Sequence, residues 1–244
     1  MNIRFIVQYD GTRYEGWQRQ VRTKETIQGK LEQAIAQVTG ETVQIQGAGR
    51  TDAGVHSRGQ TANVRLKKKV DILQFEDRVN RALPSDIAIL DSRKVPDNFH
   101  SRFGARSKLY VYRIRTGSHK DVFHRRFIWQ YGEKLDIKAM TKAAMLMEGT
   151  HDFRGFTSNK KMKTGTERTV YSITMEESDD LLTLSFTGDG FLTNMVRIMT
   201  GTLVEVGEGK RSIQSVENVF ITGIRADAGF TAPPEGLTLE KVMY

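Results

Sequence analysis

The chain has 244 residues and carries 37 lysines and arginines against 29 aspartates and glutamates, which gives a formal net charge of +8. It has no cysteine, so disulfides and thiolate metal sites are excluded. No apolar run approaches the roughly 18 residues of a membrane span, and the first residues lack the apolar run of a signal peptide. We therefore expect a cytoplasmic protein with no membrane partner, and the basic balance favours a polyanion such as nucleic acid.

The first part of the chain predicts strands that alternate with helices. Thr26 predicts the N-cap of an amphipathic helix that Gly40 ends, and Asp71 predicts the N-cap of a second helix that Pro84 ends. Short runs with strand-like apolar alternation lie at residues 2–9, 43–45, 61–66 and 87–90. The order β-α-β-β-α-β is the split βαβ pattern, so we expect an antiparallel sheet with both helices on one face.

The second part repeats this theme loosely. Strands are expected at residues 109–115, 127–131, 169–175, 182–186 and 237–243, and helices at 137–147, 192–206 and 212–222. A boundary is expected near Gly104, where a basic run precedes a new strand. It divides the chain into two α+β halves, residues 1–105 and 106–244. No low-complexity linker separates them, so we expect the halves to pack closely.

The most informative stretch is residues 47–60, with the sequence GAGRTDAGVHSRGQ. It places one carboxylate, Asp52, among four glycines, two arginines and a histidine. Glycines at this density let the backbone take up positive φ and approach a ligand closely, and the two cations would hold the carboxylate ionised. Such an acid could act as nucleophile, general base or metal ligand. By composition alone, a surface loop whose aspartate caps a turn fits equally well.

The same stretch resembles the signature of the TruA-type tRNA pseudouridine synthases. The resemblance continues in family order through further motifs: FHSRF at 99–103 followed by YVYR at 110–113, GTHDF at 149–153, GFLTNMVR at 190–197, and APPEGL at 232–237. It implies the pseudouridine synthase fold, in which two split-βαβ halves of the ferredoxin or RRM type share a mostly antiparallel sheet with a central cleft. It also implies a homodimer that acts on positions 38–40 of the anticodon stem-loop of tRNA.

The reaction that this resemblance implies breaks the N-glycosidic bond of uridine, turns the uracil and rejoins it through C5. The bond energy stays in the enzyme-bound intermediate, so we expect neither a cofactor nor a metal. A single carboxylate can perform this chemistry covalently, and Asp52 matches the nucleophile position of the family. Attack at the ribose C1′, attack at the base C6 and a glycal route all remain open.

Two further residues receive roles from the resemblance, and a third receives one from its position two residues before Asp52. Arg197 matches the basic residue that pairs with the catalytic aspartate and keeps it charged when the flipped base excludes water. Tyr110 matches a tyrosine that stacks on the uracil, and its hydroxyl is a candidate for removing the C5 proton. Strand alternation puts Tyr112 on the same face, so spacing does not decide between the two tyrosines. Arg50 is assigned to base flipping, because a guanidinium can fill the gap that the base leaves.

Other features bear on the substrate and on competing functions. Basic runs at residues 67–69, 125–126 and 160–163 together could follow a tRNA backbone. His56 is expected to support the loop. Thr193 stands where family members commonly carry an aromatic residue, which leaves room for a different RNA target. The competing functions are a non-catalytic RNA-binding protein and a metal-dependent nuclease, which normally needs several clustered carboxylates where only Asp52 is found.

Overall fold

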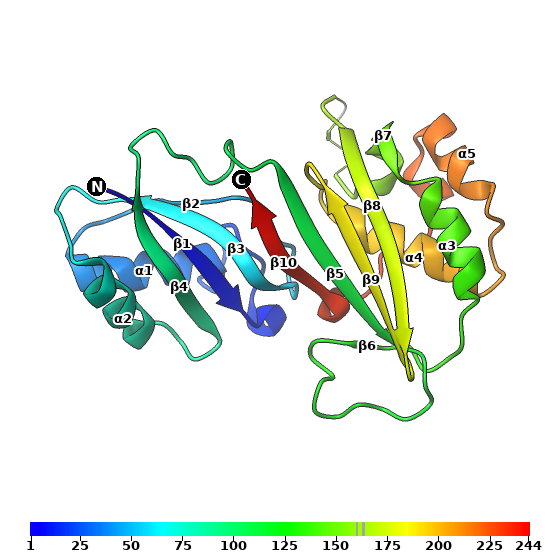
Figure 1. Cartoon of the computed structure of the whole chain (residues 1–244), viewed down its shortest axis with the longest axis horizontal. Coiled ribbons are helices and arrows are strands. Elements are labelled where there is room, and N and C mark those ends of the chain that lie inside the picture. The colour runs from blue at the N-terminus through cyan, green and yellow to red at the C-terminus, as the bar shows by residue number, and fades with distance from the viewer. Residues whose placement is uncertain (160, 163) are drawn as a thin grey trace. The chain divides into compact units, whose positions relative to one another are not determined.

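The structure, a computed structural model, describes residues 1–159, 161–162 and 164–244. It contains two compact units, of which one comprises Met1–Arg106 with Thr238–Tyr244 and the other comprises Ser107–Leu237 (Figure 1). Helices and mostly antiparallel strands occur in both units, which confirms the predicted α+β class. In its described residues, no helix has the length and apolar character needed to cross a membrane.

The first unit is a split βαβ fold. Its elements are β1 (Asn2–Tyr9), α1 (Ile27–Thr39), β2 (Ile45–Gly47), β3 (His56–Arg65), α2 (Ile72–Ala82) and β4 (Ile87–Val95). Strand β1 lies between β4 and β3 and is antiparallel to both. The late half of β3 also pairs with β2 in the antiparallel sense. The order of elements is the one that the sequence predicts.

The closing strand β10 (Leu237–Met243) pairs in parallel with the beginning of β3, with Thr238 opposite His56 and Leu239 opposite Ser57. The last residues of the chain are therefore part of the first unit. The division predicted from the sequence, residues 1–105 and 106–244, places this strand in the second half. The difference arises because the alternation of apolar residues identifies β10 as a strand but does not reveal that it pairs with β3, which is distant in sequence.

The ends of α1 and α2 follow from local capping. The Thr26 hydroxyl accepts a hydrogen bond from the Gly29 N–H at 3.3 Å, and the Asp71 carboxylate accepts one from the Gln74 N–H at 2.9 Å. Gly40 ends α1 in the left-handed region, with φ 73°. These side chains satisfy backbone groups that a helix end leaves without partners, as predicted.

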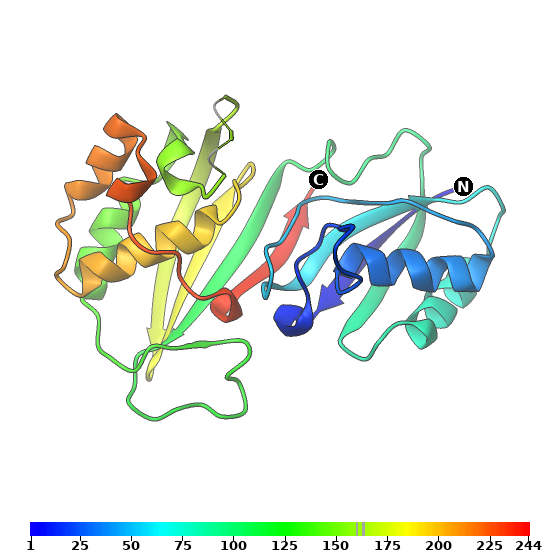
Figure 2. The same ribbon diagram turned by 180° about the vertical axis from the view of Figure 1, so that it is seen from behind.

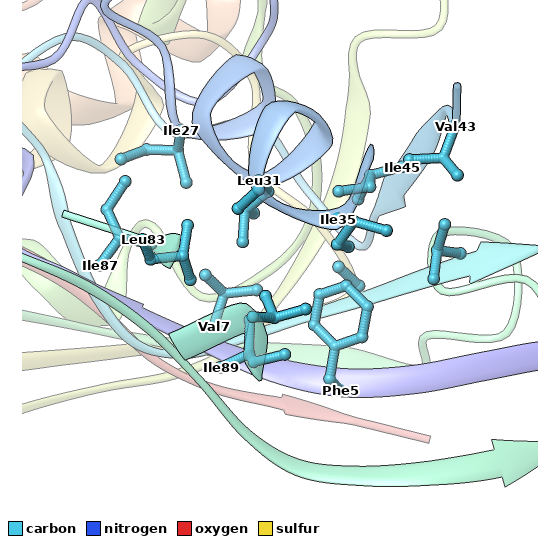
Figure 3. Close-up of a cluster of buried hydrophobic side chains, with 14 of the residues drawn as sticks. Phe5, Val7, Ile27, Leu31, Ile35, Val43, Ile45, Leu83, Ile87 and Ile89 are labelled. Carbon is cyan, nitrogen blue, oxygen red and sulfur yellow. The ribbon is translucent and has the colours of Figure 1, made fainter. Parts of the chain in front are cut away.

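A single core joins the two helices to one face of the first sheet (Figures 1 and 2). Leu31 and Ile35 of α1 point towards Phe5 and Val7 of β1 in Figure 3, and all four side chains are fully buried. Each such side chain contributes roughly 1.5–3 kcal/mol through its removal from water. This core makes the sheet a rigid base for the loops at its edge.

The second unit contains five strands and three helices within its described residues. Its elements are β5 (Ser107–Arg115), β6 (Trp129–Gln130), α3 (Ile137–Met145), β7 (Gly149–Asp152), β8 (Glu167–Ser178), β9 (Leu181–Gly188), α4 (Met195–Gly207) and α5 (Ser215–Thr222). The strand order is β5-β9-β8-β7, with antiparallel neighbours, and β6 pairs in parallel with the end of β5. Helix α4 crosses one face of this sheet (Figure 2).

Candidate active site

Asp52 lies in loop 48–55, which joins β2 to β3, and its side chain is half-buried. The backbone on both sides of it is fixed. The Thr51 hydroxyl shares a buried hydrogen bond of 2.8 Å with the hydroxyl of Tyr9, and the Val55 N–H donates to the Asp52 carbonyl oxygen at 3.2 Å. The carboxylate is therefore presented from a defined piece of backbone, although the loop has no regular secondary structure.

The side chain of Gln60 fixes the part of the loop that precedes Arg50. Its Oε1 accepts from the Gly49 N–H at 3.3 Å, and its Nε2 donates to the Gly49 carbonyl oxygen at 2.9 Å. Gln60 is fully buried, whereas the neighbouring Arg50 is exposed. The structure thus places Arg50 and Asp52 on one loop. The Arg50 side chain is exposed, while the Gln60 amide fixes the backbone of the residue before it.

Residues 10–17, for which the sequence predicts neither a helix nor a strand, also support this loop. The Trp17 N–H donates to the Thr51 carbonyl oxygen at 3.1 Å, and the Gly54 N–H donates to the Tyr14 carbonyl oxygen at 3.2 Å. Tyr14 is itself fixed, because its hydroxyl donates to Asp86 Oδ1 at 2.6 Å. The segment and the loop therefore bind each other backbone to backbone.

Gly16 makes this close approach possible. Its φ is 88°, and a Cβ atom at this position would lie 2.6 Å from the Thr51 carbonyl oxygen. Only glycine combines that backbone conformation with that proximity. The glycines and aromatic residues of this segment were a signal in the sequence, but their target lies more than thirty residues away and no local pattern identifies it.

His56 begins β3 and is buried, with 2% of its surface exposed. Its Nδ1 accepts a hydrogen bond from the Gly11 N–H at 3.0 Å and lies 3.3 Å from Asp10 Oδ1. The imidazole therefore joins the end of the Asp52 loop to the turn after β1. These contacts agree with the supporting role expected of it.

In the second unit, Arg197 occupies the first turn of α4 and is half-buried. Its Nε donates to the Ala232 carbonyl oxygen at 2.7 Å, and its Nη1 donates to Asn194 Oδ1 at 3.0 Å. The Ala232 N–H in turn donates to the Arg197 carbonyl oxygen at 3.1 Å. The guanidinium is thus oriented by two acceptors from different parts of the unit.

Asn194 is an unusual residue at the N-terminus of α4. It has a left-handed backbone, with φ 60°, and its side chain makes no capping hydrogen bond. Its Nδ2 instead donates to the Ser158 hydroxyl at 2.7 Å, while its Oδ1 accepts from Arg197. The helix therefore begins at Met195 and not at the predicted Leu192. Neither Asn194 nor Ser158 is among the site residues predicted from the sequence.

The two tyrosines of β5 are distinguished by their hydroxyl groups and surroundings. Tyr112 is fully buried, its hydroxyl donates to the Pro233 carbonyl oxygen at 2.6 Å, and burial raises its pKa well above the ordinary value. Tyr110 retains 6% exposure and packs against the edge of Phe191, with ring centroids 5.3 Å apart. Because Tyr112 is fully buried whereas Tyr110 retains some exposure, Tyr110 is the better candidate for meeting a base.

The remaining expectations concern basic runs and metal ligands. Lys160 and Lys163 lie outside the described residues, and the Lys161 N–H donates to Asn159 Oδ1 at 3.2 Å. Across the parts of the chain that the structure describes, His, Asp and Glu side chains form no group of three that could hold a metal ion. Asp52 and Arg50 belong to the first unit, whereas Tyr110 and Arg197 belong to the second.

Comparison with known proteins gives full-length relatives. A family model described as tRNA pseudouridine synthase matches residues 5–104 and 143–244. The tRNA pseudouridine synthase A of Bacillus sp. (strain KSM-64) is 41% identical over 243 residues, which cover 100% of this chain and 99% of the relative. The proteins of the same name from Geobacillus sp. (strain WCH70) and Citrifermentans bemidjiense are 44% and 42% identical, over 99% and 100% of this chain and 98% and 97% of their own lengths.

The contact at Gly16 generates a stability prediction with a matched control. Gly40 has φ 73° and open space around it, so Gly40→Ala should cost only the strain of a left-handed alanine, about 1–2 kcal/mol. Gly16→Ala adds the collision with Thr51. We expect the Trp17 and Gly54 amides to exchange hydrogen at least about tenfold faster in Gly16→Ala than in Gly40→Ala, equivalent to about 1.4 kcal/mol. Equal protection in the two variants would contradict the supporting role of segment 10–17.

Proposed function

The chain belongs to the tRNA pseudouridine synthase family, and we propose how its own side chains perform the isomerisation of uridine to pseudouridine in tRNA. The reaction breaks the C1′–N1 bond and forms a C1′–C5 bond. The hydrogen on C5 leaves as a proton, and N1 takes up a proton, so the change is redox-neutral. The chain is an isomerase, and the expectation of a non-catalytic RNA-binding protein is not retained.

Asp52 is the nucleophile of the proposed mechanism. The observation that supports this role most strongly is the fixation of its backbone by Tyr9, Gln60 and segment 10–17. A nucleophile held before the substrate arrives loses little conformational freedom as the transition state forms. Attack at C1′, attack at C6 and assistance to a glycal route all require this same fixed carboxylate.

Arg197 supplies the positive charge that keeps the Asp52 carboxylate ionised once the base has excluded water. An opposite charge favours the ionised acid, and the effect grows as the local dielectric constant falls. The two acceptors on Ala232 and Asn194 support this role, because they hold the guanidinium in one orientation. The resemblance to the family pairs the matching residues.

Arg50 and Tyr110 act on the base itself. The exposed guanidinium of Arg50 enters the stem and fills the space of the flipped uridine, which offsets part of the few kcal/mol that unstacking costs. Tyr110 stacks on the extruded uracil, which contributes roughly 1–3 kcal/mol per base. Its hydroxyl then lies near C5, where a proton must leave.

The substrate and the assembly are further parts of the proposal. The excess of positive charge, +8, suits a substrate as large and as negatively charged as tRNA. The family resemblance supports action at positions 38–40 of the anticodon stem-loop, and it also supports a homodimer in which one tRNA touches both subunits. A protein acting on tRNA in this way would work in the cytoplasm.

The nucleophile is tested by Asp52→Asn, which replaces the carboxylate by an amide of nearly the same shape. We expect turnover to fall at least about 1,000-fold while the fold and the affinity for tRNA are kept, because an amide is a poor nucleophile. The measurement is tritium release from C5-labelled uridine in tRNA. Substantial tritium release by a folded Asp52→Asn protein would remove Asp52 from the mechanism.

The geometry at the start of α4 predicts a role for Asn194 that acts through Arg197. Asn194→Gly keeps the left-handed backbone but removes both side-chain hydrogen bonds, so we expect kcat to fall about tenfold with little change in KM. Thr193→Ala is the control, because Thr193 is exposed and bonds through its carbonyl group.

A double-mutant cycle separates positioning from a general loss of structure. In an Arg197→Ala background, Asn194→Gly should have almost no further effect on kcat, since the group that it positions is gone. Additive losses would show that Asn194 acts independently of Arg197.

The target of the enzyme is tested by mapping pseudouridine in tRNA from cells with and without this protein. We expect the loss to be confined to positions 38, 39 and 40. Loss at other positions, with these three retained, would assign the enzyme to a different site in RNA.

A further inference from the structure

The FHSRF motif has no role in the mechanism above, yet a buried polar network fixes it to the first unit. The Asn63 Oδ1 accepts from both the N–H and the hydroxyl of Ser101, at 2.9 and 2.7 Å. Its Nδ2 donates to Asn2 Oδ1 at 3.0 Å, and the Asn2 Nδ2 donates to the carbonyl oxygens of Pro96 and Phe99, both at 3.0 Å. Asn2, Asn63 and Ser101 are all buried, so this segment is held as firmly as a core element.

The tip of the same segment is exposed. Phe103 has 80% of its surface exposed, and its ring centroid lies 4.3 Å from that of His100. The Nδ1 of His100 accepts from the Arg102 N–H at 3.1 Å, and its carbonyl oxygen accepts from the Gly104 N–H at 3.0 Å. A large aromatic ring is therefore held in position without being buried.

Two exposed arginines belong to this segment or are bonded to it. Arg102 precedes Phe103 in the chain and is exposed, and the exposed Arg65 donates through Nη2 to the carbonyl oxygen of Asp97 at 2.9 Å. The Asp97 carboxylate is also exposed. On the same sheet, Asp91 is paired with Arg4 and Arg93, at 2.9 and 2.5 Å. We call the set Arg65, His100, Arg102 and Phe103 the Phe103 surface.

The Phe103 surface is remote from the catalytic loop. It is fixed at Asn63, near the end of β3, whereas the loop that carries Asp52 enters the strand at His56. Seven residues of strand span about 23 Å at roughly 3.3 Å per residue. Stacked nucleotides rise about 3.4 Å each, so this distance corresponds to about seven of them.

We propose that the Phe103 surface is a second tRNA contact, which binds a nucleotide remote from the uridine being isomerised. Phe103 stacks on an unpaired base or its ribose, and Arg65 and Arg102 bind neighbouring phosphates. An exposed aromatic ring on a fixed segment that also carries or binds exposed arginines has the chemistry of a single-strand contact. A second copy of the chain fits less well, because a two-fold axis would bring these arginines against each other. The inference rests on tRNA being the substrate.

The test compares a full-length tRNA with an anticodon stem-loop whose stem is shorter than seven base pairs. Phe103→Ala should weaken binding of the tRNA about 5- to 150-fold. Arg102→Ala should make the log–log salt dependence of binding less steep by roughly 0.7–0.9. Both should leave kcat and KM on the short stem-loop unchanged. The controls are Leu73→Ala and Arg78→Ala, two exposed positions on α2, which should alter neither quantity.

Three results would overturn the inference: tRNA binding equal to that of the controls, an equal loss on the short stem-loop, or a change of oligomeric mass in light scattering. The last result would make the surface a contact between copies. Failure of the proposed mechanism is distinguishable, because it appears as activity retained in Asp52→Asn and leaves the binding comparison valid. If the wild-type enzyme is inactive on the short stem-loop, the tRNA binding measurements alone still decide whether the Phe103 surface binds tRNA.

Discussion

The loop around Asp52 is irregular, so the polar backbone groups that it buries must find partners outside the loop. Segment 10–17 and Gln60 supply those partners, and the other features of the first unit's site follow from this requirement. Gly16 is needed because two backbones meet there, and Tyr9 must reach Thr51 from within the core. The hydrophobic core makes the sheet rigid. The hydrogen bonds from Tyr9, Gln60 and segment 10–17 fix the loop that carries the Asp52 carboxylate to this rigid sheet.

In the second unit, the functional side chain is fixed by hydrogen bonds to its own guanidinium group. Arg197 is on a regular helix, but its guanidinium is oriented by an asparagine just outside that helix and by the carbonyl group of Ala232. A left-handed backbone is more accessible to asparagine than to most residues, so the bend before α4 costs little. In both units a segment from elsewhere in the chain helps to fix the functional residue: segment 10–17 binds the backbone of the Asp52 loop, and Ala232 binds the Arg197 guanidinium.

Local sequence was sufficient for the features that local chemistry decides. Thr26, Gly40 and Asp71 mark helix ends because capping involves residues only a few positions apart. Strand β7 was missed because its four residues, GTHD, have no apolar alternation. The support of Asp52 by segment 10–17, the use of Asn194 by Arg197 and the pairing of β10 with β3 all join residues by tertiary contact. Family resemblance named Asp52, Tyr110 and Arg197, and the position beside Asp52 suggested Arg50, but neither identified the groups that hold these residues.

The pairing of β10 with β3 has a consequence for biosynthesis. The beginning of β3 pairs with β10, which is synthesised only after the whole second unit. Thr238 follows His56 by 182 residues, so at about 5–20 residues per second that delay lasts roughly 9 to 36 seconds. During this time the nascent chain has an unpaired strand edge beside the Asp52 loop, and such edges are sites of mispairing and chaperone recognition. Completion of the first unit is thus timed by translation, although most of its residues leave the ribosome first.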